Sequence, residues 1–136
     1  MPRESVFVLD TSALLAFRSD EPGADEVQAL LLRAKRNQGR LFLSFMTRLE
    51  LFYCVWREEG EEAGREALRL VDSFAVEWVS CEPEILEVAA RFKAQGGLSV
   101  ADCWIGATAF VREAILIHKD PEFTKFKEIP QRSLAA

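Results

Sequence analysis

The sequence predicts an α/β layer fold with a mainly parallel sheet of 4–5 strands. Short, continuous apolar runs, which suit strands buried on both faces of a sheet, recur along the chain. Between them lie longer segments whose apolar residues repeat at helical spacing. With 136 residues, of which 49% are hydrophobic and 29% charged, the chain has the size and composition of a single globular domain, residues 1–136.

The first predicted strand, residues 5–10, is an apolar run that ends in an acid, Asp10. Thr11 or Ser12 is expected to cap the helix that follows, because a small hydroxyl side chain accepts a hydrogen bond from the free amides of a first helical turn. A second helix is expected to carry Pro22 in its first turn, where a backbone N–H is not needed. These elements place an acid and two hydroxyl side chains at the end of the first strand.

Gly39 is expected to close the second helix, and residues 41–44 are expected to form the second strand. A third helix is predicted from about residue 45 to 58, and a fourth follows the turn at Gly60. The third helix is assigned from apolar and aromatic residues that recur at helical spacing: Met46, Leu49, Tyr53 and Trp56.

The second half of the chain continues the same alternation. Residues 76–80 are expected to form a third strand, and Pro83 opens a helix that the Gly-Gly pair at residues 96–97 ends. A fourth strand is predicted at residues 114–117, with a short turn and an edge strand at residues 125–129. Strands that alternate with helices in this way favour a parallel sheet.

The helix that follows Ser99 is apolar on nearly every side, which predicts that it lies in the interior. Ser99 and Asp102 have the spacing of a capping box. An unpaired carboxylate in the first turn of a buried helix is unfavourable, so the charge of Asp102 must be neutralised by the helix N-terminus, by a metal ion or by both. The apolar residues of this helix are Val100, Ala101, Cys103, Trp104, Ile105, Ala107, Ala109, Phe110 and Val111.

Four acids are expected to meet beyond the carboxyl ends of the strands, where open parallel sheets place their sites. Asp10 ends the first strand and Asp120 follows the fourth, while Asp102 heads the buried helix and Glu50 lies one turn into the third helix. Four carboxylates without a cation would repel one another and mostly protonate, whereas Mg²⁺ or Mn²⁺ suits an oxygen-rich cluster. Such a cation activates a bound water for attack on a phosphodiester. Ser12 is placed to hold that water or a carboxylate by hydrogen bonding.

Each of these residues also has an ordinary structural interpretation. The default for Glu50 is a solvated helix residue, Asp10 is equally explained as a strand-end turn or a helix cap, and Asp120 before Pro121 can simply start a turn. His118 is the only histidine, and a lone histidine is more often structural than a ligand. The tryptophans are interpreted as core residues: Trp56, Trp78 and Trp104.

The net charge of -5 argues against a general nucleic-acid coat protein, which would be basic. It does not exclude an enzyme that meets nucleic acid through a bound cation, because the cation inverts the local electrostatics. One basic run is able to contact a phosphate backbone, although most such runs are a solvated helix face. It comprises Arg33, Lys35, Arg36 and Arg40.

Three cysteines, Cys54, Cys81 and Cys103, are widely spaced among apolar residues and have no zinc-ligand spacing. They are expected to be reduced core thiols of a cytoplasmic protein. No apolar run approaches the length of a membrane span, so no membrane partner is expected. Residues 1–5 lack the anatomy of a signal peptide, which also favours the cytoplasm.

Four segments, taken in order along the chain, resemble the motifs of the PIN-domain ribonucleases, and most of all those of the VapC toxins of toxin–antitoxin pairs. They are Val8–Ala16, Thr47–Glu50, Leu98–Asp102 and Asp120–Phe123. The resemblance implies a PIN-like three-layer α/β/α sandwich. It also implies a metal-dependent endoribonuclease that uses Mg²⁺ or Mn²⁺ to cleave single-stranded RNA or the loops of structured RNA such as tRNA.

The same resemblance assigns to one metal site Asp10, Glu50, Asp102 and Asp120. Ser12 corresponds to the small hydroxyl residue that relatives carry two positions after the first aspartate. Many relatives have threonine or serine two positions before the last aspartate, where this chain has His118. The fourth acid varies among relatives, so Glu122 is a substitute for Asp120 or an addition to it.

Relatives of this kind usually form homodimers and are silenced by a cognate antitoxin protein. A second copy of the chain and an antitoxin are therefore expected partners, in addition to the RNA substrate. The early helices carry more apolar residues than one small core obviously needs, which fits a partner surface. These residues are Leu14, Leu15, Phe17, Leu30, Leu31, Phe52 and Trp56.

The predicted reaction is in-line attack of a metal-activated water on a scissile phosphate, which leaves 5′-phosphate and 3′-hydroxyl ends. Asp10, Asp102 and Asp120 are expected to hold the ions, with Glu50 acting directly or through water. The alternative is a non-catalytic binding module whose acidic pocket captures a basic segment of a partner. A phosphatase with Asp10 as nucleophile is disfavoured, because Ser12 stands where its second acid is expected.

Overall fold

The computed structural model describes residues 5–135 and contains a five-stranded sheet in the order β3-β2-β1-β4-β5. All four strand pairings are parallel, so the sheet is wholly rather than mainly parallel. Residues 1–4, which the signal-peptide argument used, lie outside the described range. The strands are β1 (Val6–Leu9), β2 (Arg40–Ser44), β3 (Glu77–Val79), β4 (Ile115–His118) and β5 (Gln131–Ser133).

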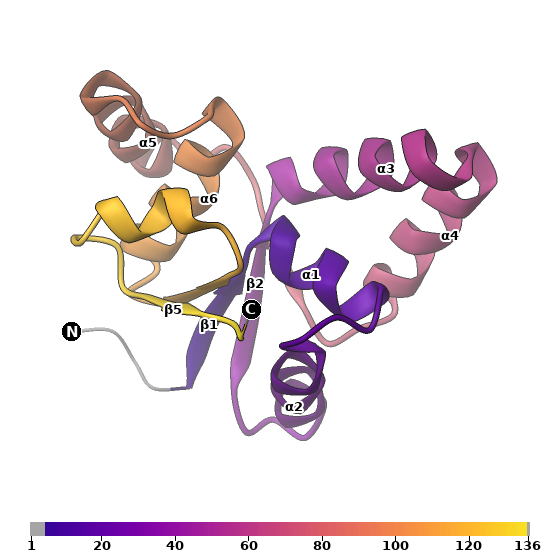
Figure 1. Ribbon diagram of the computed structural model, residues 1–136. Helices are drawn as coiled ribbons and strands as arrows, with labels where there is room; N and C mark the ends of the chain where they lie inside the picture. Colours follow the sequence, from indigo (N-terminus) through magenta and orange to yellow (C-terminus); the bar gives the residue numbers. More distant parts are fainter. Residues whose placement is uncertain (1–4, 136) are drawn as a thin grey trace.

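Helices cover both faces of the sheet, which gives the three-layer α/β/α arrangement (Figure 1). One face carries α1 (Thr11–Arg18), α2 (Ala24–Lys35), α3 (Phe45–Glu59) and α4 (Glu61–Asp72), and the other carries α5 (Pro83–Gln95) and α6 (Val100–Val111). A short 3₁₀ helix, η1 (Pro121–Lys125), follows β4. The strand positions match those predicted from apolar runs within about one residue, apart from β5.

The central strand β1 explains why continuous apolar runs predict this sheet. Val6 and Val8 pack into the core beneath α5 and α6, whereas Phe7 and Leu9 pack into the core beneath α1 to α4. Because successive side chains of a strand point to opposite faces, a strand covered on both sides must be apolar at every position. The helix that begins at Val100 is buried over its central part, from Ile105 to Ala109, as its composition predicts, but Val100 itself is exposed.

Several predicted element ends are wrong, each for a local reason. Asp10, not Thr11 or Ser12, caps α1, because its carboxylate accepts the Ser12 amide hydrogen. Pro22 precedes the Gly23 cap of α2 and so lies outside the first turn. The second helix ends at Lys35, before Gly39 is reached. After it, Asn37 adopts the left-handed conformation that glycine was expected to supply.

The turn and edge strand after β4 are displaced from residues 125–129. The turn is η1, and the edge strand β5 begins only at Gln131. Phe123, Phe126 and Ile129 are buried in the core beneath α5 and α6, so the apolar pattern of this segment reflects packing rather than a strand.

Helix α3 exposes most of the residues whose helical spacing predicts it. Its buried residues are Thr47, Leu51 and Val55, whereas Leu49, Tyr53 and Trp56 are 58%, 42% and 45% exposed. The prediction of a core role for Trp56 is therefore wrong, while Trp78 and Trp104 are partly buried against the two cores. Two apolar faces on one helix make spacing ambiguous, and the packing of α3 against α1 and α4 decides between them.

The predictions for the three cysteines and for the partner surface are also wrong in part. Cys103 is buried and Cys54 is partly buried, but Cys81 is exposed and is not a core thiol. Of the residues assigned to a partner surface, Leu14, Leu30 and Leu31 belong to this chain's own core: α1 and α2 use them to cover the sheet. Within residues 5–135 no helix is both long and apolar enough to cross a membrane.

The close contact between α3 and α4 gives a test of the fold. A Cβ atom at Gly64 would lie 2.9 Å from Cδ1 and 3.0 Å from the carbonyl oxygen of Phe52. We expect Gly64→Ala to lower the free energy of unfolding by about 1 kcal/mol or more, since overpacking outweighs the gain in helix propensity. Urea denaturation measures the change. A variant about 1 kcal/mol more stable than the wild type, as propensity alone predicts, would contradict the packing.

Candidate functional site

The candidate site is built at the carboxyl ends of β1 and β4, the two central neighbours of the sheet. The chain leaves β1 toward β2 on one side and returns to β4 on the other, so this is the point at which the strand order reverses. Crevices at such points are where open parallel sheets place ligands. The amide of Asp10 still bonds to the carbonyl of Ile117 at 2.9 Å, which fixes the end of β1 against β4.

The carboxylate of Asp10 is buried, with an exposed fraction of only 3%. Its Oδ2 atom accepts hydrogen bonds from the amide and hydroxyl of Ser12. Its Oδ1 atom is buried and has no hydrogen-bond partner in the described structure. Burial, together with smaller contributions from the charges of Glu50 and Asp120, raises the pKa of Asp10 to about 6 against the opposing hydrogen bonds from Ser12.

Ser12 ties the two strand ends together. Its hydroxyl donates to Asp10, and its oxygen accepts the amide hydrogen of Lys119 at 2.9 Å. Lys119 follows β4 directly and precedes Asp120, so one side chain joins the end of β1 to the segment that carries another acid. The hydroxyl holds a carboxylate in place, which is one of the two roles that the sequence suggests for it.

Glu50 approaches this end of the sheet from α3 and is held by a buried hydroxyl chain. The Thr11 hydroxyl lies 2.7 Å from Oε1 of Glu50 and 3.1 Å from the hydroxyl of Thr47. An ionised carboxylate only accepts, so Thr11 donates its single proton to Glu50 and receives one from Thr47. Neither threonine was predicted to support an acid. Thr11 was expected only as a cap, and Thr47 was given no role of its own within the Thr47–Glu50 segment that resembles a PIN-domain motif.

Asp102 lies in the first turn of α6, where Ser99 caps the helix by accepting the Asp102 amide hydrogen at 3.1 Å. Burial raises the pKa of Asp102 to about 8, with smaller contributions from the charges of Asp10 and Asp120, from a hydrogen bond to Asp120, and from Glu50. The helix N-terminus therefore does not neutralise Asp102 by itself, and a proton or a cation is still required.

Asp120 belongs to this group of acids, whereas Glu122 forms an ion pair outside it. The charge of Asp120 acts on both Asp10 and Asp102, and its carboxylate also caps η1 by accepting the Glu122 amide hydrogen at 3.0 Å. The exposed carboxylate of Glu122 instead pairs with Lys125 at 3.5 Å. The structure thus brings together Asp10, Ser12, Glu50, Asp102 and Asp120.

A divalent cation fits this donor set. The acids Asp10, Glu50, Asp102 and Asp120 offer only oxygen ligands, and the orphaned Oδ1 of Asp10 is a buried acceptor without a donor. Among residues 5–135, no group of three or more His, Cys, Asp or Glu side chains already stands in a geometry that could hold a metal ion. Mg²⁺ retains several waters and takes few carboxylates, so it does not need three preformed protein ligands.

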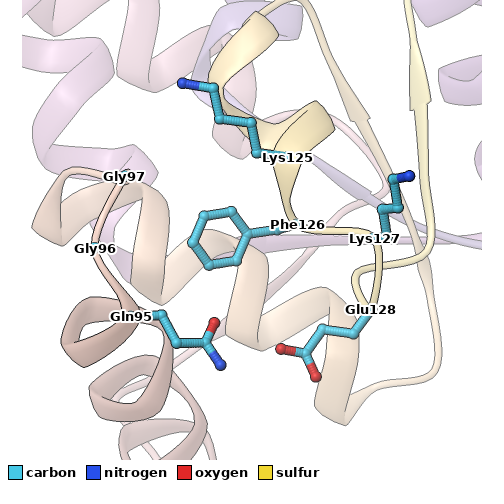
Figure 2. Close-up of a pocket in the computed structure, with 7 residues that line it drawn as sticks. All are labelled: Gln95, Gly96, Gly97, Lys125, Phe126, Lys127 and Glu128. Carbon is cyan, nitrogen blue, oxygen red and sulfur yellow. The ribbon is translucent and has the colours of Figure 1, made fainter.

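Two other features lie apart from the acids. Figure 2 shows a pocket of about 410 Å³ lined by residues 95–97 and 125–128, none of which is a predicted site residue. The side chains of Gln95 and Glu128 approach each other there beside the ring of Phe126 (Figure 2). The basic run ends at Arg40, which opens β2 at the opposite edge of the sheet and pairs with Glu77, and all four of its residues are exposed. The basic run is therefore a solvated face remote from the acids.

The sequence profile of the PIN domain matches residues 7–129. The chain is a PIN-domain protein. A VapC ribonuclease of Mycobacterium bovis is 30% identical to this PIN domain over 123 residues, which cover 85% of this chain and 91% of the relative. Ribonuclease VapC30 of Mycobacterium tuberculosis matches with the same identity and coverage. The resemblance of the four motifs to PIN-domain and VapC sequences is confirmed.

Solved structures agree on the fold of the PIN domain. The VapBC2 complex of Rickettsia felis, bound to a DNA fragment from its promoter, contains a chain that matches with a TM-score of 0.78 at 16% identity, covering 96% of this chain and 99% of that one. VapC20 of Mycobacterium tuberculosis, described as a toxin that cleaves the Sarcin-Ricin loop, matches with a TM-score of 0.67 at 15% identity, over 90% and 95% of the two chains. The predicted PIN-like α/β/α fold is confirmed.

The raised carboxyl pKa values predict how stability changes with pH when no cation is present. Between about pH 4 and about pH 8 the folded chain keeps a proton on Asp102 that the unfolded chain releases, so stability falls as the pH rises through this range. In EDTA, Asp102→Asn should raise the free energy of unfolding at pH 8 by about 1–2 kcal/mol, after allowance for solvent screening. Thermal unfolding across the pH range measures this effect.

Asp72→Asn is the matched control. The Arg48 guanidinium lowers the pKa of Asp72, so removing that carboxylate should not stabilise the protein at pH 8. Equal pH dependence in Asp102→Asn and the wild type would contradict the electrostatic account of the acid cluster.

Proposed function

We propose that this protein is a metal-dependent endoribonuclease, the toxin of a toxin–antitoxin pair, which hydrolyses phosphodiester bonds of RNA. The observation that carries the proposal is the buried, unsatisfied Oδ1 of Asp10 within a group of four mutually repelling carboxylates. Such a group is favourable at neutral pH when a divalent cation shares it. The names of the VapC relatives support RNA as the substrate class, and the structure of a toxin that cleaves the Sarcin-Ricin loop supports a structured loop.

The residues proposed to hold Mg²⁺ or Mn²⁺ are Asp10, Asp102 and Asp120, with Glu50 acting directly or through water. When bound, the cation supplies an activated water and neutralises charge on the phosphate. The chain supplies the orientation of the ligands. Ser12 fixes Oδ2 of Asp10 and so leaves Oδ1 for the cation, while Thr11 keeps one oxygen of Glu50 engaged.

The alternative of a non-catalytic binding module has less support from the structure. A basic segment of a partner would have to reach carboxylates at the surface, but Asp10 is almost fully buried and Asp102 is partly buried. A small cation can enter where a lysine or arginine chain cannot. The proposed products are RNA fragments with 5′-phosphate and 3′-hydroxyl ends.

An antitoxin protein and a second copy of the chain are the partners proposed with this activity. Complexes of similar fold, including a toxin–antitoxin complex from Klebsiella pneumoniae, support the antitoxin. The face of α3 with Leu49, Tyr53 and Trp56 is apolar and exposed in the isolated chain, which supports a homodimer.

The nuclease proposal predicts that Asp10→Asn and Asp102→Asn each lower cleavage by at least about 100-fold. Asparagine still caps α1, so Asp10→Asn should fold normally. Labelled single-stranded RNA and total tRNA, incubated with Mg²⁺, Mn²⁺ or EDTA, measure cleavage, and a 5′-phosphate-dependent exonuclease identifies the ends. Glu122→Gln is the control that should retain activity, because Glu122 lies outside the acid cluster. Full activity in either Asp variant would overturn the assignment, and cleavage in EDTA would overturn metal dependence.

The homodimer proposal predicts that sedimentation velocity shows a dimer of the wild-type chain. Leu49→Glu should shift the equilibrium toward the monomer, because it places a charge on the exposed apolar face of α3. Leu70→Glu is the matched control, since Leu70 is also exposed but lies on α4. A wild-type chain that stays monomeric at high concentration would count against the dimer.

A further inference from the structure

His118 is a buried titratable residue that the proposed chemistry does not use. It is the last residue of β4, its exposed fraction is 0%, and it stands two positions before Asp120. Both of its ring nitrogens have partners. It is therefore not available as a metal ligand, and its contacts identify a different role.

The Nδ1 atom of His118 accepts a hydrogen bond from the backbone amide of Asp120, with a distance of 3.2 Å between the nitrogens. A backbone amide can only donate, so Nδ1 must carry a lone pair. The ring of neutral His118 consequently has its proton on Nε2. This contact links the imidazole to the main chain of a proposed metal ligand.

A second, independent set of contacts requires the same form of the ring. Nε2 of His118 lies 2.9 Å from Oε1 of Gln131, which accepts its proton. The orientation of the Gln131 amide is fixed, because its nitrogen faces the carbonyl oxygens of Phe123 and Phe126 at 2.8 and 3.0 Å and can only donate to them. The oxygen of the Gln131 amide must therefore point to His118.

Together these contacts form a closed network around the segment that carries Asp120. Gln131 anchors η1 and the following loop to β5, and His118 joins that assembly to the Asp120 amide. The ring of Phe123 packs against the imidazole with centroids 5.1 Å apart. Asp120 is held on both sides, because its amide donates to His118 and its carboxylate accepts from the Glu122 amide.

We propose that His118, in its neutral form with the proton on Nε2 and completed by Gln131, is the positioning residue that aims the Asp120 carboxylate at the cation. The proposal rests on the proposed function, because it takes Asp120 as one of the acids that hold Mg²⁺ or Mn²⁺. Residues that orient a metal ligand in this way typically change metal affinity by about 10–100-fold when they are replaced.

Two substitutions separate the contacts made by the two ring nitrogens of His118. His118→Asn keeps an acceptor close to the Nδ1 position and loses the donor at Nε2. His118→Gln keeps a donor close to the Nε2 position and loses the acceptor for the Asp120 amide. Both remove a buried ring, so a merely structural role predicts similar losses of stability and similar effects on metal binding.

Calorimetric titration with Mn²⁺, performed well below each unfolding temperature, distinguishes the roles. We expect His118→Gln to weaken Mn²⁺ binding by about tenfold or more and His118→Asn to weaken it by less than about threefold. Equal weakening in the two variants, or a larger effect of His118→Asn, would overturn the proposal. Absence of Mn²⁺ binding by the wild type would overturn the metal site and the role of His118 with it. If the wild type binds Mn²⁺ and the two variants bind it with equal affinity, the role of His118 is overturned while the metal site stands.

Nitrogen NMR of the wild-type protein tests the same proposal without any substitution. At neutral pH, Nδ1 of His118 should be unprotonated and Nε2 protonated. Addition of Mg²⁺ should shift the Nδ1 and Asp120 amide resonances with one apparent affinity. A protonated Nδ1, or resonances that do not respond to Mg²⁺ while the acid cluster binds it, would overturn the proposal even if a variant failed to fold.

Discussion

The burial of the Asp10 carboxyl group is the constraint on which the rest of this site depends. The end of the central strand is enclosed by helices on both faces, so a carboxylate there loses most of its water. Ser12 satisfies one of its oxygens and leaves the other without a donor. Three further acids converge on this point, and the pKa of Asp102 rises to about 8. A proton relieves this repulsion at low pH, and the proposed divalent cation would relieve it at neutral pH.

The strand order explains why acids from distant parts of the chain meet. Because β1 lies between β2 and β4, the segments that follow these strands emerge side by side at one edge of the sheet. Asp10 and Asp120 follow β1 and β4, and Glu50 lies on the helix that follows β2. Asp102 reaches the same edge on the first turn of α6, from the opposite layer. The fold places each acid next to a rigid element.

Three of the four acids are held by a neighbour that carries no charge of its own. Ser12 orients Asp10, a chain of two threonine hydroxyls orients Glu50, and the neutral ring of His118 supports the Asp120 backbone. Uncharged supports fix a carboxylate without neutralising it, so the negative charge remains available to a cation. This division between charged acids and neutral supports preorganises the proposed metal site.

Local apolar patterns and strand ends are enough to predict the order of strands and helices, the burial of the sheet on both faces and the acids at the carboxyl ends of its strands. The sequence also carries the resemblance that the comparisons confirm. Tertiary packing sets which face of α3 is buried, that Thr11 and Thr47 support Glu50, and that Gln131 holds the ring of His118. Those contacts join residues far apart in the chain. Local periodicity does not record them, since they depend on how whole elements pack.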